Sequence, residues 1–221
     1  RIPEKNFEQK EKTVFPVEYV EVKRKDSFQT LRRRIISCPH IRNGFDEEEM
    51  FKIARRSQKV RELEKQAKAL GYSYAGQVSG EHSYTDATNK KIYIQKELSN
   101  NQAALEYAYE LQNAVNLGNK NINPFVKARK GEFKNASEFA TAALMIEVEA
   151  IITSVEVANE LGIRNLKAPF VKPMVKKWKK GKITKTELRE KVLKLVEETA
   201  VIDGMKARDY YELRYKLKYS K

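Results

Sequence analysis

Four polar side chains share one stripe of a helix that the sequence predicts over about residues 100–118: Glu106, Tyr109, Glu110 and Asn113. The last three have the spacing of H-E-x-x-H. In that motif two histidines four residues apart bind zinc, and the glutamate activates a metal-bound water. Here Tyr109 and Asn113 stand where the histidines would be, and Glu110 is retained. Neutral tyrosine and asparagine are poor ligands, since zinc prefers imidazole, thiolate or carboxylate. We therefore expect no cofactor, with zinc disfavoured, and Glu110 is a candidate catalytic residue.

A second candidate catalytic carboxylate, Glu147, lies on the next predicted helix, residues 137–161. Its neighbours one and two turns away are apolar or small: Ala140, Ala143, Leu144, Ala150, Ile151 and Ser154. A carboxylate in such surroundings is costly unless it pairs, binds a cation or takes up a proton, which makes it a site candidate. The alternative is a structural carboxylate bonded to a backbone donor, a tyrosine or a lysine. Glu149 has similar surroundings, made wetter by Glu156 one heptad further on.

The order of these elements resembles the zincin-like metallopeptidase domains of bacterial effector and toxin proteins. Such domains have a helix, a small twisted sheet, the H-E-x-x-H helix and a further helix with a third acidic ligand. The corresponding pieces are residues 46–70, KKIYIQ (90–95), YELQN (109–113) and IEVEA (146–150). The resemblance implies Glu110 as general base and Glu147 as the acidic partner. With both histidines replaced, it implies an altered or inactive metallopeptidase.

That resemblance implies a pseudoenzyme that acts by binding a protein partner. Its former active-site cleft would be lined by Glu106, Tyr109 and Asn113 beside the two carboxylates. The resemblance also implies an effector with a role in virulence, secreted into the cytoplasm of a host cell. The only histidines are His40 and His82, and either could in principle approach Glu110 in space, although lone histidines are more often loop or core residues. If the chain has any activity, the resemblance predicts a metallopeptidase-like hydrolase.

The elements that must position these side chains follow from capping residues, glycine stops and periodicity. Helices are predicted over 46–70, 100–118 and 137–161, and period-two alternation predicts strands around Pro16 and over 90–95. Beyond Pro169, a capping box begins a helix at Thr184, and a last helix aligns Tyr210, Leu213 and Leu217.

We expect an α+β fold that is predominantly helical, with a small antiparallel sheet packed on long helices. The chain divides into an N-terminal extended or edge segment (1–45), an α+β zincin-like core (46–168) and a basic helical C-terminal part packed on that core (169–221). A length of 221 residues with 41% hydrophobic residues suffices for a sizeable core.

Two stretches account for most of the net charge of +14: residues 23–34, with six basic side chains and one acid, and residues 172–185, with seven lysines and no acid. Such stretches attract phosphate backbones, anionic lipids or acidic proteins, although lysine-rich surfaces are as often only solvated. The alternative function is therefore a basic binding module for nucleic acid, an anionic membrane or an acidic protein. Its candidate binding residues are Lys176, Lys177, Trp178, Lys179 and Lys180. Trp178 could stack on a base, lie at a membrane interface or anchor the core.

Other classes of function have little support in the sequence. No apolar run approaches the ~18 residues of a membrane-spanning helix, so we expect a soluble protein. The single Cys38 excludes an internal disulfide and a cysteine-rich zinc site, and it lies too close to His40 along the chain for the two to face each other as a catalytic pair. Phosphate-binding glycine motifs are absent.

Overall fold

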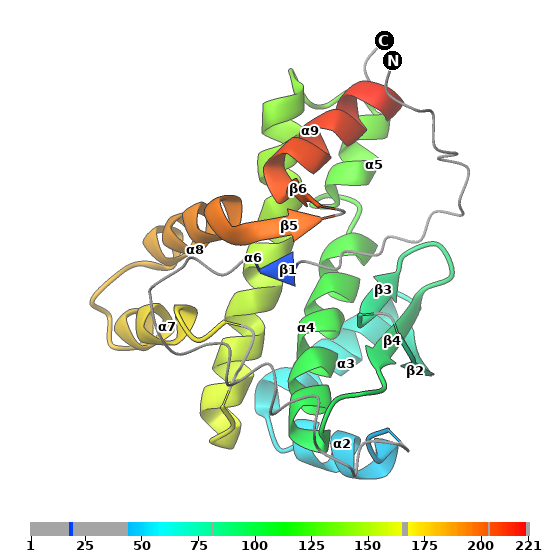
Figure 1. The fold of residues 1–221 in the computed structure, drawn as a ribbon, viewed down its shortest axis with the longest axis vertical. Helices are drawn as coiled ribbons and strands as arrows, with labels where there is room; N and C mark the ends of the chain where they lie inside the picture. Colours follow the sequence, from blue (N-terminus) through cyan, green and yellow to red (C-terminus); the bar gives the residue numbers. More distant parts are fainter. Residues whose placement is uncertain (1–17, 20–43, 81, 165–167, 203, 220–221) are drawn as a thin grey trace.

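The computed structural model describes residues 18–19, 44–80, 82–164, 168–202 and 204–219. Two long helices, α4 (Asn100–Gly118) and α6 (Ala136–Leu161), pack against each other at the centre (Figure 1). Each begins at a side-chain cap, because Ser99 accepts from the Gln102 amide and Asn135 from the Glu138 amide. Gly162 ends α6 in the left-handed conformation that favours glycine. Both helices therefore confirm the sequence prediction to within a residue or so.

The predicted helix over 46–70 is two helices, α2 (Glu47–Ala54) and α3 (Gln58–Ala69). The chain breaks at Ser57, whose hydroxyl oxygen accepts from the Val60 amide and caps α3. The same hydroxyl donates to the Glu160 carboxylate of α6 over 2.5 Å. Continuing the first helix would remove both bonds, so the serine favours a second helix start over one unbroken helix.

A three-stranded sheet covers α4 on the side away from α6, with strand order β2 (Ser73–Val78), β4 (Lys91–Gln95), β3 (Tyr84–Asp86). Ile92 and Ile94 face inward from β4, as the sequence predicts. The expectation of an antiparallel sheet is wrong for one pair, because β2 runs parallel to the central β4 and only β3 is antiparallel to it. The reason is topological, since the chain reaches the far edge at β3 before a tight turn returns it through the middle as β4.

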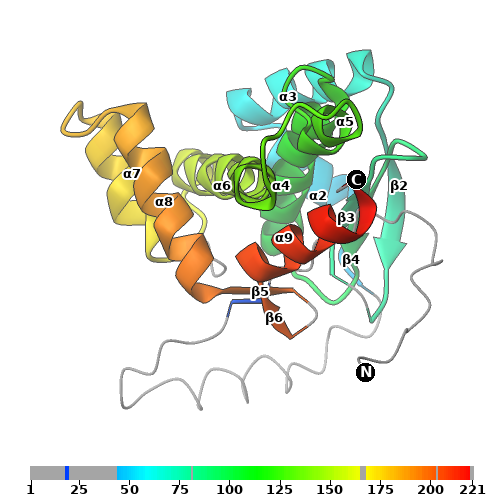
Figure 2. The same cartoon turned by 90° about the horizontal axis from the view of Figure 1, so that it is seen from above.

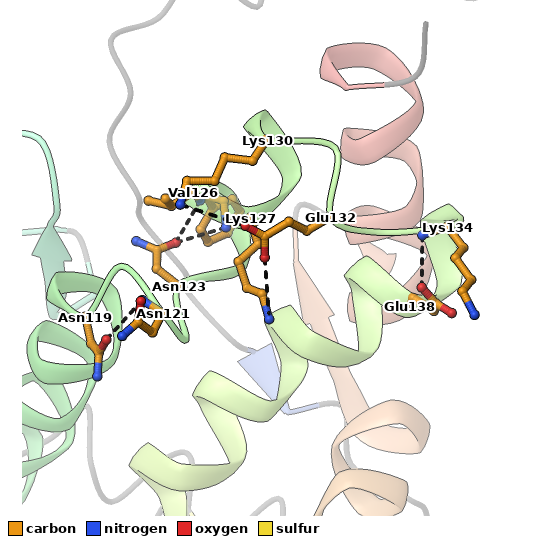
Figure 3. A network of polar contacts seen from close by, with 10 residues as sticks. Asn119, Asn121, Asn123, Val126, Lys127, Lys130, Glu132, Lys134 and Glu138 are labelled. Atoms are coloured by element: carbon orange, nitrogen blue, oxygen red, sulfur yellow. Dashed lines mark hydrogen bonds and ion pairs between the residues drawn. The ribbon is translucent and has the colours of Figure 1, made fainter.

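The connection between α4 and α6 is held by asparagine side chains around the short helix α5 (Pro124–Arg129), as Figure 3 shows. Asn119 Oδ1 accepts from the Asn121 amide at 3.0 Å, and Asn123 Oδ1 accepts from the amide of Val126 at 3.3 Å (Figure 3). Asn123 Nδ2 donates to the Leu117 carbonyl at 2.6 Å. These bonds cap α5 and tie it to the end of α4.

The C-terminal part contains α7 (Val171–Lys179), α8 (Lys185–Thr199) and α9 (Ala207–Lys218). All three pack on α6, on the side away from the β2–β4–β3 sheet for α7 and α8 (Figures 1 and 2). The capping box predicted at Thr184 is present, with Glu187 bonded to the Thr184 backbone and side chain. Between α8 and α9 lie strands β5 (Ala200–Ile202) and β6 (Met205–Lys206).

A second small sheet joins the two ends of the described chain in the order β1–β5–β6, with all pairs antiparallel. Its strand β1 (Glu18–Tyr19) lies in the stretch that alternation predicts as an edge strand, and it occupies an edge. Residues 1–17 and 20–43 of the predicted N-terminal segment, including the basic stretch 23–34, lie outside the described residues. The α+β, predominantly helical class is thus confirmed.

The last helix turns a different side to the core than the predicted stripe of Tyr210, Leu213 and Leu217. The residues of α9 that turn inward are Ala207, Tyr211 and Tyr215, whereas Leu213 and Leu217 are exposed. Tyrosine rings bury more apolar area than leucine side chains, and both rings contact Phe139 of α6, Tyr211 edge-on and Tyr215 in a tilted arrangement, so they occupy the interior. Within the described part of the chain, no helix has the length and apolar character needed to cross a membrane.

Candidate functional site

The polar stripe of α4 is buried between two apolar clusters of the protein. One cluster joins α2, α3, β4 and α4, and the other joins α6 to the three C-terminal helices. All four members of the stripe are buried: Glu106, Tyr109, Glu110 and Asn113. Charged and amide groups in such a position must be hydrogen-bonded, so their partners decide what the site can do.

Tyr109 and Glu147 are directly joined. The Tyr109 hydroxyl donates to the Glu147 carboxylate across the α4–α6 interface, and the two side chains are 7% and 1% exposed. This is one of the partners that the structural alternative for Glu147 allows. It is also a bond between the positions that the zincin resemblance assigns to the first zinc histidine and to the third acidic ligand.

Glu110 is held by a strand that the sequence analysis did not connect with it. The Thr85 hydroxyl of β3 lies 2.8 Å from Glu110 Oε2 and 3.0 Å from the Glu110 backbone carbonyl, and it can donate to either. Asn113 Nδ2 donates to the same Oε2 at 3.4 Å. Consecutive residues of α4 therefore reach different elements, with Tyr109 turned to α6 and Glu110 to β3.

A third element contributes a tyrosine from the C-terminal part. Tyr211 of α9 is fully buried, and this burial, with the negative charge of Glu147 as a smaller cause, raises the pKa of its hydroxyl well above its usual value. The hydroxyl is therefore neutral at any physiological pH. Nothing in the sequence signalled this residue, because the tyrosines of the last helix could equally have faced solvent.

A layer of neutral polar residues continues the site along the α4–α6 interface. Thr153 donates to Gln112 Oε1 at 3.0 Å, and Gln112 Nε2 donates to Asn116 Oδ1 at 3.0 Å. About two turns earlier on α4, the Leu105 carbonyl accepts from the Ser154 hydroxyl at 3.4 Å. These bonds set the register of the two helices and so keep Tyr109 opposite Glu147. The spacing of Gln112 and Asn116 at i, i+4 was the available sequence signal.

The donor set of this site does not suit zinc. Around Tyr109 and Glu110, the described side chains offer carboxylates, a phenol, an amide and hydroxyls, of which only carboxylates are usual zinc ligands. No group of three or more histidine, cysteine, aspartate or glutamate side chains is arranged to hold a metal in the ranges that the structure describes. His82 joins no such group, and Cys38 and His40 lie outside the described residues. The expectation that zinc is disfavoured stays a prediction for solution measurement.

Glu149 and Glu156 have ordinary structural partners. Glu149 forms ion pairs with Arg189 and, at 3.8 Å, with Lys185, and Glu156 pairs with Lys179 at 3.3 Å. These pairs dock the hairpin of α7 and α8 on α6. The more polar surroundings predicted for Glu149 agree with its partly buried position and its basic partners.

The candidate binding residues of α7 lie far from the α4 stripe, on the other side of α6 (Figure 2). Trp178 is partly buried and packs against the core cluster, with the Lys185 ammonium 5.9 Å from its ring centroid. The four lysines Lys176, Lys177, Lys179 and Lys180 are exposed. The predicted site residues therefore form two separate places, one buried and one on the surface.

Comparisons with known proteins do not add a family. No protein-family model matches the chain, and neither the curated proteins nor the solved structures provide a match. The function of this chain is therefore inferred from the geometry of these two places.

Proposed function

We propose that this chain is a zincin-like domain of the effector type in which the metal centre has been replaced by hydrogen bonds. It acts as a pseudoenzyme that binds a protein partner. Glu110 and Glu147 keep the positions of the general base and the acidic ligand, and Tyr109 and Asn113 take the places of the two histidines.

The observation that carries this proposal is the hydrogen bond between Tyr109 and Glu147. In a zinc site, a metal ion with charge +2 would neutralise the buried acidic ligand and hold the two helices together. Here a phenol hydroxyl joins the two helices through a hydrogen bond that stabilises the Glu147 carboxylate without neutralising its charge. Tyr109 and Glu147 are 38 residues apart in sequence, and the zincin resemblance expects their positions to share one metal ion. In this chain one hydrogen bond joins them.

The same geometry argues for binding rather than hydrolysis. Zinc hydrolysis requires a metal-bound water within reach of a general base. The Glu110 carboxylate is buried and accepts from Thr85 and Asn113, so its Oε2 already has protein donors as partners. Glu110 therefore serves as a hydrogen-bond acceptor between α4 and β3 in this proposal.

Restoring the histidines tests the zincin-like assignment. The double variant Tyr109→His/Asn113→His would place two imidazoles at i, i+4 beside Glu147. We expect it to bind one zinc ion per chain, measured by calorimetry, and to give the visible spectrum of a four-coordinate ion when loaded with cobalt. Adding Glu147→Gln should weaken zinc binding by about 10-fold or more, since it removes a ligand.

A matched control separates a rebuilt site from any pair of histidines on a helix. Gln58 and Glu62 are exposed and have the same i, i+4 spacing on α3. The Gln58→His/Glu62→His variant has no third ligand and should bind zinc only weakly. Equal zinc affinity of the two double-histidine variants, with both folded by circular dichroism, would contradict the zincin-like assignment.

A further inference from the structure

Several exposed lysines lie along α7 and in the turn after it, and we call this set the α7 lysine face. Its members are Lys172, Lys176, Lys177, Lys180 and Lys182. None of the five forms an ion pair within the described residues, and no acidic residue occurs between Phe170 and Thr186. Like charges so close together repel one another, so this surface is built at some cost in stability.

The fold separates these lysines from those with structural roles. Val171 and Val175 are buried on the inner side of α7, which packs on α6 and α8. Lys179 and Lys185 pair with glutamates of α6 and hold the hairpin in place. The α7 lysine face is exposed to solvent, whereas Val171 and Val175 face the interior. The hairpin of α7 and α8 stands at one edge of the molecule (Figures 1 and 2).

An exposed aromatic ring adjoins the lysines. Phe170 directly precedes α7 and is 66% exposed, more than any other large hydrophobic residue that the structure describes. Lys177 lies seven residues later and therefore shares its stripe of the helix. Trp178, the other aromatic residue of this stretch, is packed against the core. The solvent side of α7 thus combines one large apolar side chain with five cations.

We propose that the α7 lysine face and Phe170 form a docking surface for an anionic lipid membrane. Lysine ammonium groups are attracted to negatively charged headgroups without any fixed geometry, and a phenylalanine ring next to them can enter the interfacial region. The surface acts without a membrane-spanning helix. This inference goes beyond the proposed function, because it does not depend on the zincin-like assignment of the α4 site.

The same features fit nucleic acid less well. All five cations are lysines, which lack the planar fork that reads base edges or clamps phosphates in two bonds. A single helix on an outer edge presents a convex surface, whereas proteins that bind single strands use a groove with several stacking rings. Phe170 is the one exposed ring on this side of the described hairpin.

Vesicle binding by the full chain tests the proposal. We expect cosedimentation with vesicles of phosphatidylcholine and phosphatidylserine, much weaker cosedimentation with phosphatidylcholine alone, and weakening by added salt. The variant Lys176→Gln/Lys177→Gln/Lys180→Gln should lower the partition coefficient about 100-fold, at about fivefold per lysine. Phe170→Ala should lower it about 10-fold while leaving the salt dependence unchanged.

A control triple variant removes the same charge elsewhere. Lys65, Lys68 and Lys120 are exposed on other elements, and Lys65→Gln/Lys68→Gln/Lys120→Gln should lower the partition coefficient less than fivefold. If both triple variants lowered the partition coefficient equally, net charge alone would explain vesicle binding and the proposal would be overturned. The proposal would also fail if the chain bound single-stranded RNA or duplex DNA more tightly than the anionic vesicles and Phe170→Ala left vesicle binding unchanged.

Discussion

The buried centre at α4, α6 and β3 and the α7 lysine face both present charged or polar residues from helices, yet they are held in opposite ways. In the buried centre, Tyr109 and Thr85 donate to carboxylates that come from distant parts of the chain. On the α7 lysine face, no described residue pairs with the five cations. A substitution in the first region should therefore lower stability, and a substitution in the second should change binding with little effect on stability.

The largest expected effect tests the buried side of this comparison. Tyr109→Phe removes the hydroxyl that donates to Glu147, and we expect a loss of about 2 kcal/mol in the free energy of unfolding, because a buried carboxylate loses a donor. The control is Tyr107→Phe on the same helix, whose hydroxyl lies 3.1 Å from the half-buried Glu64. It should lose about 0.5–1 kcal/mol. Denaturant unfolding measures both, and equal losses would show that burial does not distinguish the two bonds.

A smaller loss of stability should follow when the hydrogen bond between β3 and Glu110 is removed. Thr85→Val keeps the shape of the side chain and removes the hydroxyl that lies 2.8 Å from the carboxylate. We expect a loss of about 1–1.5 kcal/mol in the free energy of unfolding. Thr186 is exposed in the first turn of α8, and Thr186→Val should change stability by less than about 0.5 kcal/mol. If Thr85→Val were as stable as the parent, Glu110 would not need its partner on β3.

The third prediction concerns alkaline pH and the buried Tyr211. Its pKa is raised by burial, so the unfolded chain loses this proton near pH 10 while the folded chain retains it. Stability should consequently fall as the pH rises above about 10, with this residue contributing a slope of at most about 1.4 kcal/mol per pH unit. Urea unfolding between pH 9 and 11 should give a shallower decline for Tyr211→Phe. Parallel curves for the variant and the parent would rule out a buried, neutral hydroxyl at this position.

The smallest expected effect tests the exposed side. Lys176→Gln, Lys177→Gln and Lys180→Gln should each change the free energy of unfolding by less than about 0.5 kcal/mol, and relief of repulsion favours a slight gain. Lys179→Gln serves as the comparison, because Lys179 pairs with Glu156 at 3.3 Å and should be the only one of the four to lose stability. Thermal unfolding at low salt measures the ranking. A loss of more than 1 kcal/mol for Lys177→Gln would place it among the structural lysines.

Local signals in the sequence predicted most of the secondary structure. The caps at Ser99 and Thr184 and the stop at Gly162 act within a few residues, so they can be read from the chain alone. The break at Ser57 was missed because the apolar stripe of 46–70 continues through it, and the serine gains its second bond only from Glu160 of α6. The parallel pairing of β2 with β4 was missed for a similar reason, since strand order is decided by contacts between strands.

The candidate site was predicted in part. Helical spacing grouped Tyr109, Glu110 and Asn113, and the apolar neighbours of Glu147 indicated a buried carboxylate. Thr85 and Tyr211 carried no signal, because a threonine on a strand and a tyrosine on a helix are compatible with either a buried or an exposed position. The sequence is compatible with Trp178 either on the surface or in the core. The structure packs it against the core.

The sequence by itself determined the two long central helices, the burial of Glu147 and the excess of lysine in α7, because each depends on residues within about two helical turns. Only the tertiary structure decided that Tyr109 meets Glu147, that Glu110 meets Thr85 of β3, and which lysines of the α7–α8 hairpin are left without an ion pair among the described residues. The physical reason is one of range. Capping and helical periodicity act between near neighbours along the chain, whereas a buried carboxylate is stabilised by whichever donor the packing of distant elements brings within hydrogen-bonding distance.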